Sequence, residues 1–160
     1  MFTNIAVNKD NRITLTACLP SEILAEVDLV VANLKLSLTQ HNKLQLPEEI
    51  MKIRKLTTEI KNISVVLLNN NIIISGLCSY YFTVITKHNQ YLTFTSQAPF
   101  SVLQKVSGIN PDMKAKWNVD TTTYSYITGN KIDYWTNINL QITILSKETL
   151  PVLTNKCSQV

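Results

Sequence analysis

The chain has 160 residues, of which 45% are hydrophobic and 16% charged, and its formal net charge is +4. This length suits a single domain with a core that needs no metal or disulfide support. It contains no apolar run of 18 residues and no signal-peptide pattern at its start, so we expect no membrane insertion and predict synthesis in the cytoplasm. Glycine and proline are scarce while threonine and asparagine are abundant, a balance that predicts an all-β protein.

Basic residues are spread along the chain, and the only cluster is Lys52, Arg54 and Lys55. Arg54 and Lys55 would point to opposite faces of a strand, which favours a solvated strand surface over a phosphate-binding patch. The sequence also lacks an aromatic RNA-binding motif, zinc-finger spacing and a recognition-helix pattern. We therefore expect no nucleic-acid partner.

The N-terminal region predicts an extended arm. Residues 1–10 have scattered apolar side chains and read as flexible or extended, and residues 12–20 then alternate between apolar and polar side chains. Such a strand pairs within its own domain or is donated to the sheet edge of a neighbouring subunit, and the sequence leaves both open. The apolar row of this assembly arm is Ile13, Leu15, Ala17 and Leu19.

The next segment allows two interpretations. Ser21 followed by Glu22 and Glu26 could cap and start a helix. Alternation of apolar residues at period two favours a strand over residues 27–39 instead, with a polar turn at residues 40–43. A second long strand is predicted over residues 53–68, with a bulge near residues 61–62 where the pattern changes.

A three-stranded meander is predicted around the run of three asparagines at residues 69–71, because asparagine tolerates the positive φ of tight hairpin turns. The strand of residues 72–85 is apolar on both faces and should be covered on both. Gly76 inside it indicates a bulge or a close backbone approach, and Pro99 indicates that the following strand ends or bends. Phe100 is most simply a core residue.

Two long strands close the domain. The first begins near Met113, and residues 128–130 form a hairpin turn. The second has one unbroken apolar face, which should fix its pairing register, whereas residues 149–160 are predicted to be a tail. That face consists of Ile132, Tyr134, Thr136, Ile138, Leu140, Ile142 and Ile144.

Part of this pattern resembles the SPOCS domain of spore coat and envelope proteins from endospore-forming Firmicutes. The resemblance rests on the strand Ile-Ile-Ile-Ser-Gly at residues 72–76 running to Tyr-Tyr-Phe at 80–82, on Ala-Pro-Phe at 98–100, and on the loop of residues 106–113. It covers residues 46–147. It implies a structural role for Gly76, Pro99 and Phe100, and deposition on the spore surface after synthesis in the mother cell.

Candidate chemistry is sparse. His41 and His88 lie in predicted turns, the carboxylates are scattered, and no Cys-His pair has metal spacing, so we predict no enzyme, no metal and no cofactor. Cys78 is expected to be a small buried residue. Because three cysteines leave one unpaired in a protein destined for the cell exterior, an inter-subunit disulfide between Cys18 and Cys157 is one hypothesis, and free thiols are the other.

The predicted fold is an antiparallel β-sandwich or flattened barrel (residues 21–148, SPOCS-like core 46–147), with an extended arm (1–20) and a tail (149–160). The predicted function is a self-assembling subunit of the spore coat, exosporium or a spore filament, built by edge-strand addition with itself as partner. One alternative is an adaptor that docks onto another coat protein without polymerising. Another is a glycan-binding module that uses aromatic residues among Tyr80, Tyr81, Trp117, Tyr124, Tyr126 and Trp135.

Overall fold

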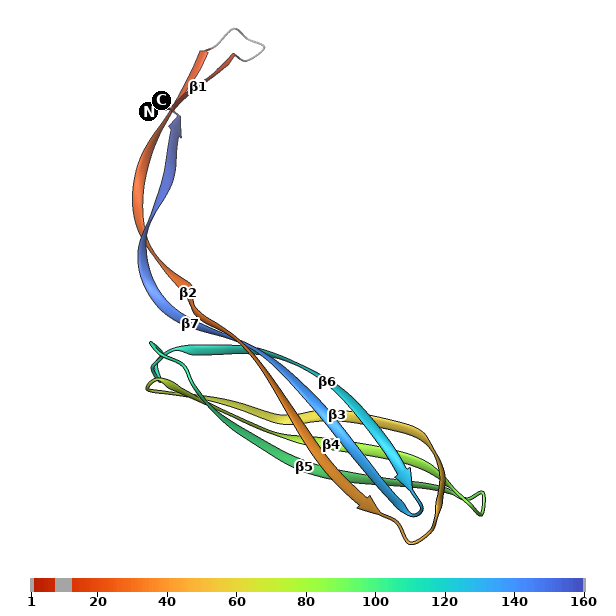
Figure 1. The fold of residues 1–160 in the computed structure, drawn as a ribbon. Coiled ribbons are helices and arrows are strands. Elements are labelled where there is room, and N and C mark those ends of the chain that lie inside the picture. The colour runs from red at the N-terminus through yellow and green to blue at the C-terminus, as the bar shows by residue number, and fades with distance from the viewer. Residues whose placement is uncertain (1, 8–12, 160) are drawn as a thin grey trace. The chain divides into compact units, whose positions relative to one another are not determined.

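A computed structural model of the chain describes the backbone of residues 2–7 and 13–159 and the side chains of residues 23–152. Every element in the described part is a strand, which confirms the all-β prediction. The helix considered at Ser21 is wrong, because this segment lies inside a strand. The strands are β1 (Phe2–Val7), β2 (Ile13–Gln45), β3 (Ile50–Leu68), β4 (Asn71–Thr86), β5 (Tyr91–Lys105), β6 (Lys114–Thr128) and β7 (Lys131–Gln159), as labelled in Figure 1.

The chain forms two compact units. One unit is Val30–Ser146, called here the sandwich unit, and the other combines Met1–Leu29 with Lys147–Val160, called here the ribbon unit. Strands β2 and β7 each contribute to both units. The region predicted as a C-terminal tail is therefore a strand to Gln159, because it continues β7 beside the N-terminal segment.

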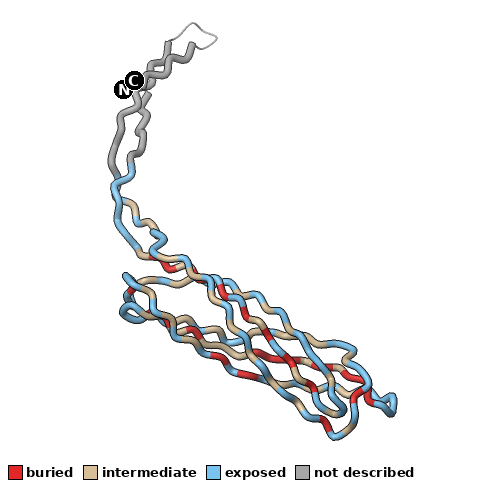
Figure 2. Tube along the Cα trace, viewed as in Figure 1, coloured by how far each residue is buried: buried red, intermediate tan, exposed pale blue. Residues whose placement is uncertain are grey.

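The sandwich unit consists of two antiparallel three-stranded sheets. One sheet has the order β2-β7-β6 and the other β3-β4-β5. Buried residues alternate with exposed ones along the strands, and they form one core cluster to which both sheets contribute (Figure 2). The two sheets stay separate, so the sandwich is the form that this chain adopts.

The predicted meander is present as β3-β4-β5. Asn70 has a φ of 58° in the β3–β4 turn, and Asn62, at φ 54°, sits at the register shift between β3 and β4 that the sequence predicts. Except at Gly76, the inner face of β4 is buried from Ile72 to Thr86, but on its outer face Ile73, Leu77 and Tyr81 remain partly exposed. The expectation that both faces are covered is therefore wrong for the outer face, since no second layer covers that side within the sandwich unit.

The inner face of β7 is buried along its whole predicted length, from Ile132 to Ile144. Tyr134 on this face packs edge-on against Tyr80 and Phe82 of β4, with ring centroids 4.7 Å and 5.2 Å apart. The hydroxyl oxygen Oγ1 of the buried Thr136 lies 3.1 Å from Oγ1 of Thr123. Oγ1 of Thr123 in turn lies 2.8 Å from Oγ1 of Thr58 in the other sheet. Side chains therefore hold the two sheets together, both by apolar packing and by hydrogen bonds.

Two predicted interruptions are absent. The polar turn expected at residues 40–43 is wrong, because β2 continues to Gln45 and its outward side chains pair with β7. The strand end or bend expected at Pro99 is also wrong, because β5 runs on to Lys105. Strand β5 is the edge of its sheet, where alternate N–H groups face away from the neighbouring strand, so a proline there need not remove a ladder hydrogen bond.

Candidate assembly and binding surfaces

The ribbon unit pairs the predicted assembly arm within the same chain. Strand β1 is antiparallel to the first part of β2, with Val7 opposite Ile13, Ile5 opposite Leu15 and Thr3 opposite Ala17. Leu19 follows in the same strand. The side chains of Ile13, Leu15, Ala17 and Leu19 lie outside the described residues, as do those of Cys18 and Cys157, so the disulfide between the two cysteines stays a prediction.

The described part of the ribbon unit leaves large apolar side chains exposed. Ile23 and Leu24 are adjacent in β2 and therefore point to opposite faces, yet their exposed fractions are 47% and 76%. Leu29 in β2 and Leu150 and Val152 in β7 are also exposed. An ion pair of 2.9 Å joins Lys147 Nζ to Glu26 Oε2 and raises the pKa of Lys147. Where its side chains are described, the ribbon thus lacks a core on either face.

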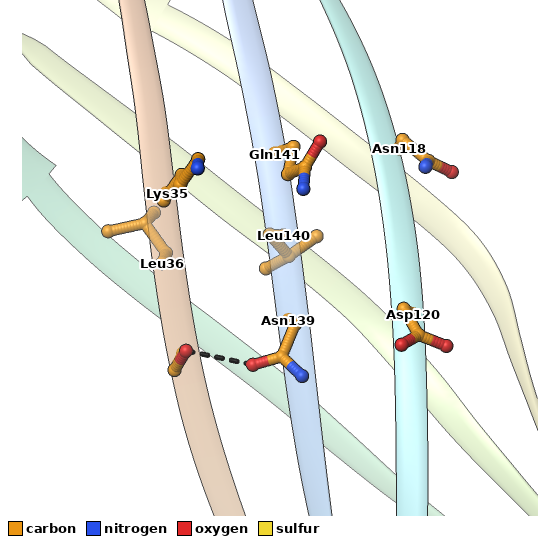
Figure 3. A pocket seen from close by; sticks show the side chains of 8 residues that line it. Lys35, Leu36, Asn118, Asp120, Asn139, Leu140 and Gln141 are labelled. Carbon is orange, nitrogen blue, oxygen red and sulfur yellow. Dashed lines mark hydrogen bonds between the residues drawn. The ribbon is translucent and has the colours of Figure 1, made fainter.

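The sandwich unit has a polar face. On the outer side of sheet β2-β7-β6, every outward residue of residues 33–43, 116–126 and 133–143 is polar or aromatic. Hydrogen bonds cross from β2 to β7 along this face, and one of them, from Ser37 Oγ to Asn139 Oδ1 at 2.8 Å, is the dashed line in Figure 3. A hollow beside it is lined by Lys35, Leu36, Ser37, Asn118, Asp120, Asn139, Leu140 and Gln141 (Figure 3).

Aromatic side chains gather toward the β6–β7 turn of this polar face. Tyr124 of β6 lies directly opposite Trp135 of β7, and Tyr126 lies opposite Asp133. The ring of His41 in β2 stacks on Trp135 with centroids 4.6 Å apart and planes 3° apart. The sequence pattern did not reveal this cluster, because it predicted a turn at His41. The turn predicted for His88 is confirmed, since this residue lies between β4 and β5.

The six aromatic residues considered for glycan binding divide by location. Tyr124, Tyr126 and Trp135 share the polar face, but Tyr80 is buried in the core and Tyr81 belongs to the other sheet. Trp117 lies opposite the buried Ile142, on the inner side of β6. The structure therefore assembles only half of the set, and sequence alternation along β6 and β7 was the signal that could have separated them.

The three residues that carry the family resemblance form one structural unit. Gly76 of β4 lies opposite Phe100 of β5, and Leu77 lies opposite Pro99. A Cβ added to Gly76 would stand 2.6 Å from Cζ of Phe100, so the glycine makes room for the ring. The core position predicted for Phe100 is confirmed, whereas the close neighbour of Gly76 is the ring of Phe100 and not another backbone segment.

The described residues contain no cluster of three or more histidine, cysteine, aspartate or glutamate side chains that could hold a metal ion. Burial raises the pKa of the Cys78 thiol, which keeps it protonated and weakly nucleophilic. No helix in the described part of the chain is long and apolar enough to cross a membrane.

Comparisons of the chain with protein-family models, with curated proteins and with solved structures find no match.

Proposed function

We propose that this chain is a self-associating structural subunit, located in the coat, the exosporium or a filament of a bacterial spore, as its resemblance to SPOCS domains implies. The observation that carries the proposal is the ribbon unit, which exposes apolar side chains on both faces. Residues such as Leu24 need a covering partner that the described chain does not supply.

The energetics of the ribbon favour association. A two-stranded ribbon is marginally stable on its own. Full burial of one valine, leucine or isoleucine side chain stabilises by roughly 1.5–3 kcal/mol, so half burial of the five exposed side chains would contribute on the order of 5 kcal/mol. Assembly requires that this gain in free energy, together with the backbone hydrogen bonds of the added strand, exceeds the cost of association.

The strand edges of the sandwich unit support a second copy as that partner. Each open sheet has two edge strands with unpaired backbone groups. Register shifts interrupt β3, and Pro99 removes an N–H group from β5. Strands β2 and β6 carry neither of these protections within the sandwich unit, so sheet β2-β7-β6 has the edges that best accept an added strand.

Strand β6 has the better defined acceptor edge. The backbone N–H of Val119 donates to Asn118 Oδ1 at 3.0 Å, and that of Thr121 donates to Asp120 Oδ1 at 2.9 Å. Each of these N–H groups donates to the preceding side chain of its own strand, which indicates that both face the open edge. An incoming strand would replace both local hydrogen bonds with backbone ones.

In the proposed mechanism, the segment of residues 12–19 leaves its own β1 and extends the sheet of a neighbouring subunit. Backbone hydrogen bonds would provide affinity, and its apolar row would set the register. Such a head-to-tail contact generates an open fibre unless its rotation closes a ring. A disulfide between Cys18 and Cys157 of adjacent subunits would then resist dissociation.

The decisive experiment compares the full chain with a deletion of residues 1–20 by light scattering and electron microscopy. We expect the full chain to form high-mass particles and the deletion to remain small. Unchanged assembly of the deletion would reject strand donation, and a full chain that stays monomeric at high concentration would favour the coat adaptor.

A matched pair of substitutions tests the ribbon separately. Leu24→Glu places a charge on the ribbon, and Leu103→Glu places one on β5 at a similarly exposed leucine, 65% against 76%. We expect only Leu24→Glu to reduce assembly. If Leu103→Glu alone reduced it, the contact would lie on the outer face of β3-β4-β5, and the argument from the ribbon would fail.

Two further measurements address the location and the cysteines. Immunogold labelling of sporulating source cells should mark the spore surface, and labelling confined to the interior of vegetative cells would reject the spore assignment. Gels of assembled material without reductant should show bands above the monomer. Monomer alone would exclude the inter-subunit disulfide.

A further inference from the structure

We propose that the aromatic end of the polar face, defined as His41, Asp133, Trp135, Tyr124 and Tyr126, binds a neutral carbohydrate chain. This inference goes beyond assembly, because a single sandwich unit contains the whole site. Two of its tyrosines have no protein partner among the described residues, its other groups are held in place, and the surrounding face carries little net charge.

Two tyrosines of the site project from β6 without being used by the fold. The exposed fractions of Tyr124 and Tyr126 are 59% and 65%. Among the described residues, neither ring stacks on another ring and neither hydroxyl has a hydrogen-bond partner. Aromatic residues on strands usually serve core packing or cross-strand pairs. Neither tyrosine belongs to the core, and Tyr124 faces Trp135 across the strands without a stacked ring contact, so both rings are available to a ligand.

The remaining groups of the site are held in place. Asp133 Oδ1 lies 3.1 Å from Nε2 of His41, and the carboxylate accepts this hydrogen bond. Lys43 Nζ lies 3.5 Å from the same oxygen. Because His41 also stacks on Trp135, the indole ring is fixed between strands and 37% of the residue stays exposed. A rigid aromatic surface loses little side-chain entropy on binding.

A row of amide donors continues from the aromatic end along β2 and β7. Thr39 Oγ1 donates to Asn137 Oδ1 at 2.9 Å, and Ser37 donates to Asn139 Oδ1 at 2.8 Å. Each of these bonds uses the amide oxygen only. In the described part of the chain, the NH₂ groups of Asn137 and Asn139 have no protein partner, so they remain available as donors.

This combination matches the chemistry of a sugar. A pyranose ring has an apolar C–H face that packs on an aromatic ring and a rim of hydroxyl groups that hydrogen-bond to amides. The face carries Lys35, Lys43 and Lys116 against Asp120 and Asp133, a formal charge of only +1. Phosphate backbones require denser positive charge than this face carries. A neutral glycan is therefore the favoured ligand.

The test is a sedimentation assay of the full chain with microcrystalline cellulose and chitin, with single-stranded DNA as competitor and with a parallel sample without polysaccharide that measures sedimentation by self-assembly alone. We expect retention on at least one polysaccharide in the presence of DNA. Tyr124→Ala and Tyr126→Ala should each weaken retention about tenfold, which corresponds to a loss of about 1.4 kcal/mol of binding free energy. Tyr91→Ala, which removes an exposed tyrosine from the other sheet, should leave retention unchanged.

Two controls separate loss of binding from loss of folding. Tyr124→Phe keeps the ring and should retain most of the binding. The near-ultraviolet circular dichroism spectrum of each variant shows whether the aromatic side chains of the core remain packed. The proposal is overturned by no retention on any polysaccharide, by equal retention of both alanine variants and the parent, or by complete displacement with DNA, which would assign the face to nucleic acid. Assembly is scored in parallel, so failure of either proposal is recognised separately.

Discussion

Replacing Gly76 with alanine should destabilise the sandwich unit through a single contact. The new Cβ would lie 2.6 Å from Cζ and 2.7 Å from Cε1 of Phe100. Two carbon atoms in van der Waals contact are about 3.5 Å or more apart, so the buried ring of Phe100 would have to move by about 1 Å. Overpacking of this kind costs about 1–3 kcal/mol, and removing glycine from a strand returns about 0.5–1 kcal/mol. We expect a net loss of about 1–2 kcal/mol in the free energy of unfolding.

The assay is urea unfolding followed by tryptophan fluorescence, since Trp117 and Trp135 both belong to the sandwich unit. Phe100→Leu should lower stability on its own by leaving a cavity, but it should relieve most of the cost of Gly76→Ala in the double variant. Gly108→Ala is the matched control, because alanine would be strained at the φ of 82° but its Cβ would have no neighbouring atom within 4 Å. Its cost should add to that of Phe100→Leu without coupling.

A Gly76→Ala variant as stable as the parent chain would contradict a clash between the new Cβ and the ring of Phe100. So would an equal loss of unfolding free energy from Gly76→Ala with phenylalanine and with leucine at position 100. In either case, the glycine would serve the backbone conformation of β4 and not the packing of the ring.

Three further predictions follow from other contacts. Burial raises the pKa values of Tyr80 and Tyr134 above the unfolded value near 10, so the stability that these two groups contribute should be fully present below that pH and be lost above it. Replacing both with phenylalanine should reduce the loss of stability at high pH in unfolding titrations. Asn70→Ala should cost about 1 kcal/mol in urea unfolding, more than Asn70→Gly, because alanine resists the φ of 58°. Alanine at both Asn118 and Asp120 should speed assembly in light scattering by uncovering edge N–H groups, and slower assembly would contradict the edge assignment.

Local sequence was a reliable guide where one residue type has one physical use. Asparagine runs tolerate positive φ, and Asn70 and Asn62 adopt it at the predicted turn and bulge. The long alternation in β7 left only one face that could be buried, and that face is the core. Phe100 was likewise assigned to the core from its residue type, and it is buried there.

Sequence was a poor guide where a partner far along the chain decides the outcome. His41 and its polar neighbours read as a turn, but they form a strand because β7 supplies Asp133 and Trp135 about ninety residues later. Pro99 read as a strand end, but it is tolerated because β5 lies at a sheet edge.

The amino-acid sequence by itself determined that this protein is made of antiparallel strands, and it determined which face of β7 is buried. Those properties follow from residue type and a period of two, which are local. Only the tertiary structure decided which strands become neighbours. That choice brought the two ends of the chain together in one ribbon and gathered Tyr124, Tyr126, Trp135 and His41 on one exposed face. Pairing between distant strands depends on the packing of the whole core, which no single segment encodes.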